Sequence, residues 1–140
     1  MTNIGFTGTQ IGMTDAQKTK VLEYLCLVDY MVTLHHGGCV GSDSEAHQLA
    51  LSCGADAIVY PGINKDGVAA KRGDFPAAAE VYPERFYLDR NRDIVDNSDI
   101  LIATPKGFEE EQRGGTWYTI RYARTKEKPV TIILPDGRLG

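Results

Sequence analysis

The sequence predicts an α/β fold with a parallel sheet, and three observations support this prediction. Five short runs rich in Ile, Val, Leu and Thr are spaced along the 140 residues, and Gly or Pro bounds most of them. Several runs are almost continuously apolar rather than alternating, as expected of strands that helices cover on both faces. Helical patterns fill the gaps, so strand and helix alternate along the chain.

The five apolar runs are the predicted strands, and they cover residues 3–8 (NIGFTG), 31–37 (MVTLHHG), 56–62 (DAIVYPG), 99–105 (DILIATP) and 129–135 (PVTIILP). Parallel strands that alternate with helices are joined by right-handed crossovers. We therefore predict a single Rossmann-like domain, a three-layer sandwich around a five-stranded parallel sheet in the order 3-2-1-4-5. In this order the first and fourth strands lie side by side.

Four helices are predicted between these strands. The first begins at a Thr-x-x-Gln capping box, Thr14 to Gln17, and continues with an apolar stripe of Val21, Leu22, Leu25 and Val28. The second has the same spacing at Ala46, Leu49, Ala50 and Cys53. The third covers residues 83–97, and the fourth covers residues 116–126 with Ile120 and Ala123 facing inward.

One segment interrupts the alternation. Residues 63–82 read INKDGVAAKRGDFPAAAEVY and show neither period. A stretch of about 20 irregular residues is unusual in a compact domain and is often a functional lid. The alternative is a plain surface excursion with a short helix near PAAAEV.

Composition limits the classes of function. Hydrophobic residues make up 42% of the chain and charged residues 24%, and the net charge is −4. The acidic balance argues against sequence-independent nucleic-acid binding, which needs a basic face, although a local pocket for one phosphate remains compatible. No apolar run approaches the ~20 residues that span a bilayer, so no membrane association is expected.

The three cysteines suggest a compartment. Cys26, Cys39 and Cys53 are an odd set without CxxC spacing. We therefore expect no disulfide framework, a reducing environment and a cytoplasmic location.

Ligands of open parallel sheets bind beyond the carboxyl ends of the strands, where the strand order reverses. Three glycine-bearing loops are expected there. The first is GFTGTQIGMT, in which Gly8 lets a ligand approach the backbone and Thr9 supplies a hydroxyl group before a helix N-terminus. The pattern is not GxGxxG, and a tight strand-to-helix turn would explain it equally.

The second loop is HHGGCVGSDSEAH, where Gly38 and Gly41 precede Ser42 and Asp43 at the start of a helix. Ser42 or Asp43 could simply cap that helix. A metal site of His36, Asp43 and His47 is a further alternative, but the spacing matches no strong metal motif, so we predict no metal and no cofactor. Contact between Asp43 and a ribose or base is the favoured interpretation.

The third loop is PKGFEEEQRGGT, which places Glu109, Glu110 and Glu111 before a glycine turn. Gly114, Gly115 and Thr116 would offer backbone N–H groups and a hydroxyl group to a phosphate at the helix start. The acidic run could also be only a solvated loop tip. The next residue, Trp117, would either pack the helix or stack on a base.

Together these segments resemble the SLOG superfamily, which includes the "lonely guy" phosphoribohydrolases and the DprA-type DNA-processing proteins. The resemblance covers most of the chain and rests on GFTGT, HHGGCVGSD, RNRDIVDNSDILIATP and RGGTWYTIRYARTKEKPVTII. In the phosphoribohydrolases, an Arg on a helix precedes an SD-hydrophobic-P strand, and a PGGxGTxxE turn binds the 5′-phosphate. The Arg and the Glu of these two motifs carry the cleavage of the N-glycosidic bond.

The resemblance implies roles for particular residues. Arg90 stands nine residues before Asp99, and Pro105 ends the strand, as the pattern requires. Gly114, Gly115 and Thr116 match the phosphate turn after a six-residue insertion. Arg90 would face the ligand, whereas Arg85 and Arg92 would pair with nearby acids.

The chain departs from the family at the catalytic carboxylate. Tyr118 and Thr119 replace the Glu-Glu pair, and neither is ionised at neutral pH, so neither can stabilise an oxocarbenium ion. A glutamate of the acidic run, such as Glu111, or Asp43 could take that role beside Arg90. Otherwise the chain hydrolyses nothing.

The sequence thus favours a nucleotide-binding protein that cleaves or transfers the N-glycosidic bond of a nucleoside 5′-monophosphate. The alternatives are a non-catalytic sensor or sequestering protein with the same pocket, and a partner-binding domain with an empty pocket. The phosphate is expected between GFTGT and RGGT, and the ligand-binding residues would be Gly8, Thr9, Gly38, Gly41, Ser42, Gly114, Gly115 and Thr116. The superfamily also implies a homodimer or higher oligomer.

Overall fold

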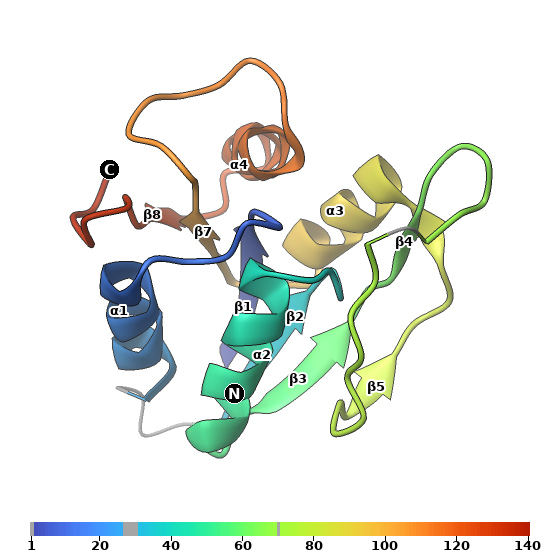
Figure 1. Ribbon diagram of the computed structural model, residues 1–140, viewed down its shortest axis with the longest axis horizontal. Coiled ribbons are helices and arrows are strands. Elements are labelled where there is room, and N and C mark those ends of the chain that lie inside the picture. The colour runs from blue at the N-terminus through green and yellow to red at the C-terminus, as the bar shows by residue number, and fades with distance from the viewer. Residues whose placement is uncertain (1, 27–30, 70) are drawn as a thin grey trace.

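A computed structural model describes residues 2–26, 31–69 and 71–140. Its main sheet has six parallel strands in the order β5-β3-β2-β1-β7-β8 (Figure 1). These strands are β1 (Thr2–Gly8), β2 (Val32–His36), β3 (Asp56–Val59), β5 (Glu80–Val81), β7 (Ile100–Thr104) and β8 (Val130–Ile132). The α/β class and the order of the five predicted strands are confirmed, but the prediction of five strands is wrong because β5 adds a sixth at the edge.

The predicted central pair is present. β1 pairs with β2 through Ile4 and Leu34, and with β7 through Phe6 and Ile102. These side chains are buried, because helices cover both faces of the sheet. The carboxyl ends of β1 and β7 therefore lie next to each other, and the strand order reverses between them.

The helices are α1 (Asp15–Cys26), α2 (Ser42–Ser52), α3 (Tyr87–Asp96) and α4 (Gly115–Thr125). The capping box before α1 forms, since the Thr14 N–H donates to Gln17 Oε1 at 3.0 Å and the Gln17 N–H donates to Thr14 Oγ1 at 3.1 Å. The predicted stripe residue Val28 lies outside the described residues. The third helix begins four residues later than predicted, because Arg85–Phe86 forms β6.

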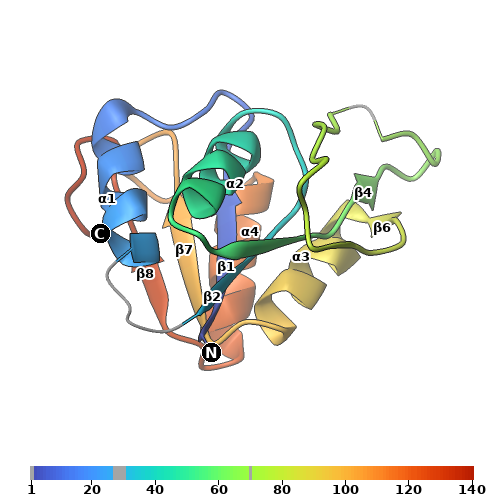
Figure 2. The ribbon, with the colours of Figure 1, turned by 90° about the horizontal axis from the view of Figure 1, so that it is seen from below.

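Two apolar layers hold the helices to the sheet. α1 and α2 contact each other, and their Val21, Leu25, Ala46 and Ala50 pack with the central strands. α3 and α4 also contact each other, and α4 packs on β7 and β8 through Trp117, Ile120 and Ala123 (Figures 1 and 2). These contacts place the N-terminus of α4 beside the carboxyl end of β7.

The irregular segment is joined to the fold at several points. β4 (Gly62–Ile63) pairs with β6 in a small second sheet beside α3 (Figure 2). The Val40 N–H donates to the Lys71 carbonyl oxygen at 2.9 Å, and the Gly73 N–H donates to that of Gly38 at 2.8 Å. No helix forms near PAAAEV among the described residues. The segment is therefore held against the loop after β2 by backbone hydrogen bonds.

Cys26 and Cys53 form a disulfide, which contradicts the expectation of no disulfide. Cys26 ends α1 and Cys53 follows the last residue of α2, and the packing of these two helices brings their Cα atoms within 5.5 Å. The cysteine count is therefore no argument for a reducing compartment. Within the described ranges, no helix has the length and apolar character to cross a membrane.

Candidate functional site

A cavity of about 590 Å³ opens at the carboxyl ends of the central strands. Thr7, Gly8 and Thr9 form one part of its wall, and Gly114, Gly115 and Thr116 form another. The remaining wall comes mainly from α3 and from the loops after β2 and β7. The segments GFTGT and RGGT therefore face the same space, because β1 and β7 are neighbours in the sheet.

The cavity wall is more basic than the rest of the chain. Its cationic side chains are Lys71, Arg90, Lys106 and Arg113, and its carboxylates are Asp43 and Glu111. The lining thus carries four positive groups against two acidic ones, whereas the whole chain has a net charge of −4. Such a local excess attracts an anion into an acidic protein.

The first turn of α4 presents free backbone donors to the cavity. Gly114 precedes the helix with a φ of 109°, a conformation that favours glycine. The N–H groups of Gly115, Thr116 and Trp117 make no hydrogen bond to the described part of the chain. A Cβ atom added at Gly115 would meet only Asn91 Nδ2 within 4 Å, so this backbone is open to a ligand. Unsatisfied N–H groups and the helix dipole together favour an anion.

Two buried polar atoms of cavity residues also have no protein partner. They are Thr9 Oγ1 and Trp117 Nε1, for which the described residues offer no hydrogen bond. Trp117 is only 6% exposed and packs against Ala103, Ile120 and Ile132, as the helix-packing interpretation predicts. A buried polar atom without a partner costs free energy. These two atoms have almost no accessible surface, so a ligand would reach them only if neighbouring atoms moved.

The glycines and serine of the first two loops have packing roles of their own. A Cβ atom at Gly8 would lie 2.5 Å from Ser42 Cβ and 2.6 Å from Thr104 Oγ1, so only glycine fits between α2 and β7. Gly41 has a φ of 82° and abuts the backbone of Gln10. Gly38, Gly41 and Ser42 lie next to the cavity-lining loop but not on the cavity wall. Their part in ligand binding remains a prediction.

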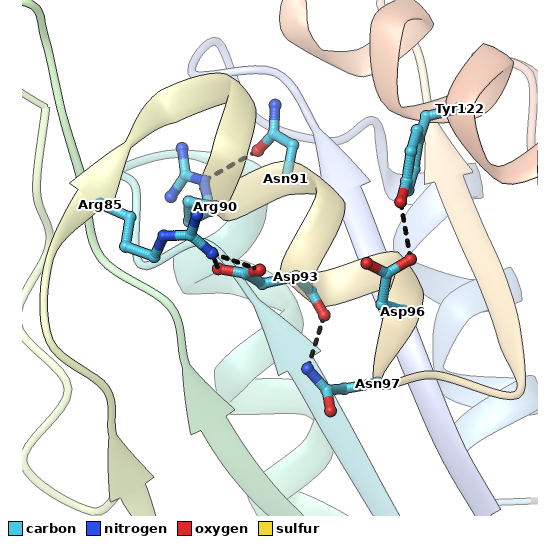
Figure 3. A network of polar contacts seen from close by, with 7 residues as sticks. All are labelled: Arg85, Arg90, Asn91, Asp93, Asp96, Asn97 and Tyr122. Carbon is cyan, nitrogen blue, oxygen red and sulfur yellow. Dashed lines mark hydrogen bonds and ion pairs between the residues drawn. The ribbon is translucent and has the colours of Figure 1, made fainter.

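Arg90 faces the cavity from α3 and is fixed by the ends of two strands. Its Nη1 donates to the carbonyl oxygens of Gly37 and, at 2.9 Å, of Tyr60. Its Nε donates to Asn91 Oδ1 at 2.8 Å (Figure 3). Nη2 lies 3.8 Å from Cys39 Sγ, and the guanidinium stacks over the Tyr87 ring. Because Arg90 is 5% exposed, these contacts leave mainly Nη2 available to a ligand.

Asp43 lies close to Arg90 at the start of α2. Its Oδ2 accepts a hydrogen bond from the Cys39 N–H at 3.2 Å. Burial raises the pKa of this carboxyl group to about 6, although the positive charge of Arg90 acts in the opposite direction. A carboxyl group that titrates near neutrality is suited to donate or accept a proton.

The structure separates the glutamates of the acidic run. Glu111 lines the cavity, with an oxygen 3.7 Å from Lys106 Nζ. Glu110 instead pairs with Arg121 at 3.1 Å, and neither Glu109 nor Glu110 reaches the wall. Among the described residues, Asp43 and Glu111 are therefore the carboxylates at the cavity.

Tyr118 and Thr119, which stand where the phosphoribohydrolases have a Glu-Glu pair, make hydrogen bonds outside the cavity. The Tyr118 hydroxyl accepts a hydrogen bond from Arg92 Nε at 2.7 Å, and Thr119 Oγ1 donates to the Gly115 carbonyl oxygen at 2.7 Å. Neither lines the cavity. Of the neighbouring arginines, Arg85 pairs with Asp93 as predicted, at 2.6 Å (Figure 3), whereas Arg92 pairs with a tyrosine.

The two histidines of the metal alternative bind each other instead. His36 Nε2 and His47 Nδ1 are 2.9 Å apart, and the Gly38 N–H donates to His36 Nδ1 at 3.0 Å. Burial and the nearby cationic groups lower the pKa of His36 to about 3, so this ring is neutral. No group of three His, Cys, Asp or Glu residues with metal-site geometry occurs in the described part of the chain.

Sequence reasoning gave no role to several polar residues of the cavity wall, namely Gln10, Asn64, Lys71, Tyr87, Asn91, Lys106 and Arg113. Asn64 and Lys71 belong to the irregular segment, whose path no periodicity predicts. Asn91 follows Arg90 directly in the sequence, so its position beside a predicted ligand-facing arginine could have indicated a place on the cavity wall.

Comparison with known proteins finds solved structures of similar fold. No family model matches the sequence, and no curated protein matches it. A molybdenum cofactor binding protein from Rippkaea orientalis matches with a TM-score of 0.71 and 22% identity, over 95% of this chain and 76% of that one. DNA processing protein A from Helicobacter pylori, whose structure concerns single-stranded DNA binding, matches with a TM-score of 0.64 and 18% identity. The match covers 94% of this chain and 64% of that one. The Moco carrier protein from Chlamydomonas reinhardtii matches with a TM-score of 0.54 and 20% identity, over 98% of this chain and 77% of that one.

These proteins belong to the SLOG superfamily. The chain has the SLOG fold. The resemblance inferred from the four sequence segments is thereby confirmed for the fold, since identities of 18–22% carry the architecture and not the activity.

Proposed function

We propose that this protein binds a nucleotide and holds its 5′-phosphate at the first turn of α4. The observation that carries the proposal is the set of unsatisfied donors on one cavity. Within the described residues, the N–H groups of Gly115, Thr116 and Trp117 have no protein acceptor, and all three residues line the cavity. A phosphate group has enough acceptor oxygens to satisfy several of these donors at once.

The size and charge of the cavity support the same ligand class. A volume of about 590 Å³ is within the range of small-molecule sites. The wall offers Lys71, Lys106 and Arg113 to a phosphate, and Tyr87 as apolar surface for a base or sugar. The net negative charge of the chain does not oppose this, because the cationic side chains and the backbone donors are gathered at the cavity.

A second function, cleavage of the N-glycosidic bond, is favoured by Asp43. This carboxyl group is buried beside Arg90 and has a pKa of about 6. In its ionised form it would stabilise the positive charge that develops on the sugar as the bond to the base breaks. A water molecule would then form a bond to the anomeric carbon, and its proton would pass to the nitrogen of the departing base. Glu111 is the other carboxylate on the wall and is the alternative for this role.

The test of binding is a titration of the purified chain, by calorimetry, with nucleoside 5′-monophosphates and the matching nucleosides. We expect the monophosphates to bind at least tenfold more tightly, because the phosphate supplies the acceptors. Equal binding of the nucleosides, or no binding of either set, would refute the proposal. The panel includes molybdenum cofactor and a single-stranded oligonucleotide, since similar structures are named for these ligands.

The test of catalysis uses the same panel. After incubation, chromatography measures the free base that is released. Release by the parent chain that disappears in Asp43→Asn supports hydrolysis through Asp43, whereas loss only in Glu111→Gln assigns the role to Glu111. Tight binding without release by the parent favours a non-catalytic sensor or sequestering protein.

A further inference from the structure

Asn91 lies on α3 directly after Arg90, and its side chain is half-buried on the cavity wall. Neither the sequence motifs nor the proposed function gives it a role. Its amide group has one strong contact, the hydrogen bond that its Oδ1 accepts from Arg90 Nε at 2.8 Å.

That contact fixes which way the amide points. A guanidinium group only donates hydrogen bonds, so the amide atom that faces Arg90 must be the oxygen. The NH₂ group of Asn91 then points away from Arg90, as Figure 3 shows. It makes no hydrogen bond to any described residue.

The free NH₂ group faces the start of α4. Asn91 Nδ2 lies 3.6 Å from the position that a Cβ atom on Gly115 would occupy. Apart from the neighbouring residues and the backbone of α4, it is the only described atom within 4 Å of that position. The space beside Gly115 is thus bordered by backbone N–H groups from α4 and by an amide donor from α3.

We propose that Asn91 is a phosphate-binding residue, which donates through Nδ2 to the same oxyanion that the first turn of α4 holds. The inference rests on the proposed function and extends it, because it adds a side-chain donor from a second helix. The neutral amide sits where a carboxylate would repel the ligand.

A competing role is that Asn91 only positions Arg90. The two roles respond differently to Asn91→Asp. Aspartate keeps an oxygen for Arg90 Nε and strengthens that contact through its charge, but it replaces the NH₂ donor by a charged acceptor. If Asn91 only positions Arg90 and the phosphate lies beyond its reach, ligand binding should change little. If Asn91 contacts the phosphate, the lost donor and the repulsion by the new carboxylate should both weaken binding. Asn91→Leu, which removes both contacts, completes the set.

The experiment measures binding of inorganic phosphate and adenosine 5′-monophosphate to the parent, Asn91→Asp, Asn91→Leu, a matched control, and Gly115→Asp, which places a carboxylate in the proposed phosphate site. The control is Asn97→Asp, which makes the same charge change on the residue after α3, away from this cavity. We expect Asn91→Asp to weaken both ligands roughly 10- to 100-fold. Asn97→Asp should bind within twofold of the parent.

The outcomes separate this inference from the proposed function. If Asn91→Asp binds like the parent while Gly115→Asp does not bind, the phosphate site stands and the role of Asn91 is refuted. If Asn91→Leu loses binding and Asn91→Asp retains it, Asn91 is a positioning residue and the inference is also refuted. If the parent binds neither probe, both proposals fail. Circular dichroism of each variant checks that the fold is intact.

Discussion

Gly115→Asp separates ligand binding from folding, because the two should change in opposite directions. Gly115 is the first residue of α4 and has no positive φ, so a side chain is allowed there. The only described atom within 4 Å of the new Cβ would be Asn91 Nδ2 at 3.6 Å, which is an ordinary contact. The aspartate would point its carboxylate into the space proposed for the phosphate.

The expected magnitudes follow from this geometry. Replacing a glycine whose backbone a side chain can adopt stabilises by about 0.4–1 kcal/mol, because the unfolded chain loses freedom. An acidic residue in the first turn adds about 0.3–1 kcal/mol through the helix dipole. A melting temperature equal to that of the parent, or a few degrees higher, is therefore expected. Two like charges at about 4 Å repel by roughly 4 kcal/mol near a protein surface, which is equivalent to about a thousandfold loss of phosphate affinity.

The assay pairs calorimetric titration of a nucleoside 5′-monophosphate with thermal unfolding. Gly107→Asp makes the same charge change at a glycine with no atom within 4 Å of its Cβ position, and Gly107 does not line the cavity. Gly115→Ala adds the Cβ atom without the charge. Both controls should bind within a few-fold of the parent. If Gly115→Asp also does so, the phosphate is held elsewhere and the reasoning is refuted.

Three further predictions concern stability and assembly. The folded pKa of Asp43, about 6, lies above its ordinary value of 3.8, so the ionised carboxylate penalises the folded state above pH 6 and the penalty disappears below pH 4. In urea unfolding at pH 8, Asp43→Asn should therefore have a free energy of unfolding up to about 3 kcal/mol higher than that of the parent. At pH 3.5 the two should be equally stable, and an equal difference at both pH values would contradict this. Reduction of the Cys26–Cys53 disulfide should lower the free energy of unfolding by about 3–4 kcal/mol, given its sequence separation of 27. A double serine variant should not respond to reductant, and an unchanged midpoint in the parent would refute the estimate. Light scattering at micromolar concentration should give the mass of a dimer or larger assembly, and a monomer mass would refute that expectation.

The sheet was predictable because apolar strands carry a strong signal. Residues 3–8 and 99–105 were placed side by side from their sequence pattern, and they pair as β1 and β7. β5 was missed because Glu80 and Val81 are both exposed, so this two-residue edge strand has no apolar pattern. The disulfide was missed because an odd number of cysteines without CxxC spacing argued against pairing, and only the packing of α1 against α2 brings Cys53 to Cys26.

The candidate site was predictable in part for a similar reason. A glycine turn before a helix indicates an open N-terminus, and Gly114, Gly115 and Thr116 do border the cavity. The orientation of a side chain is not encoded in this way. Tyr118 turns to Arg92, and the free side of Asn91 depends on the contact of its oxygen with Arg90. Such directions arise from tertiary packing, which no local pattern describes.

The anchoring of Arg90 affects how tightly a ligand can bind. The carbonyl oxygens of Gly37 and Tyr60 hold the guanidinium from the ends of two neighbouring strands. Its charge is thus already oriented toward the cavity before any ligand arrives, and no side-chain freedom has to be lost on association. The free energy needed to orient the guanidinium is therefore spent during folding and not during binding. A charge that is oriented in advance stabilises a ligand's opposite charge without further rearrangement of the protein.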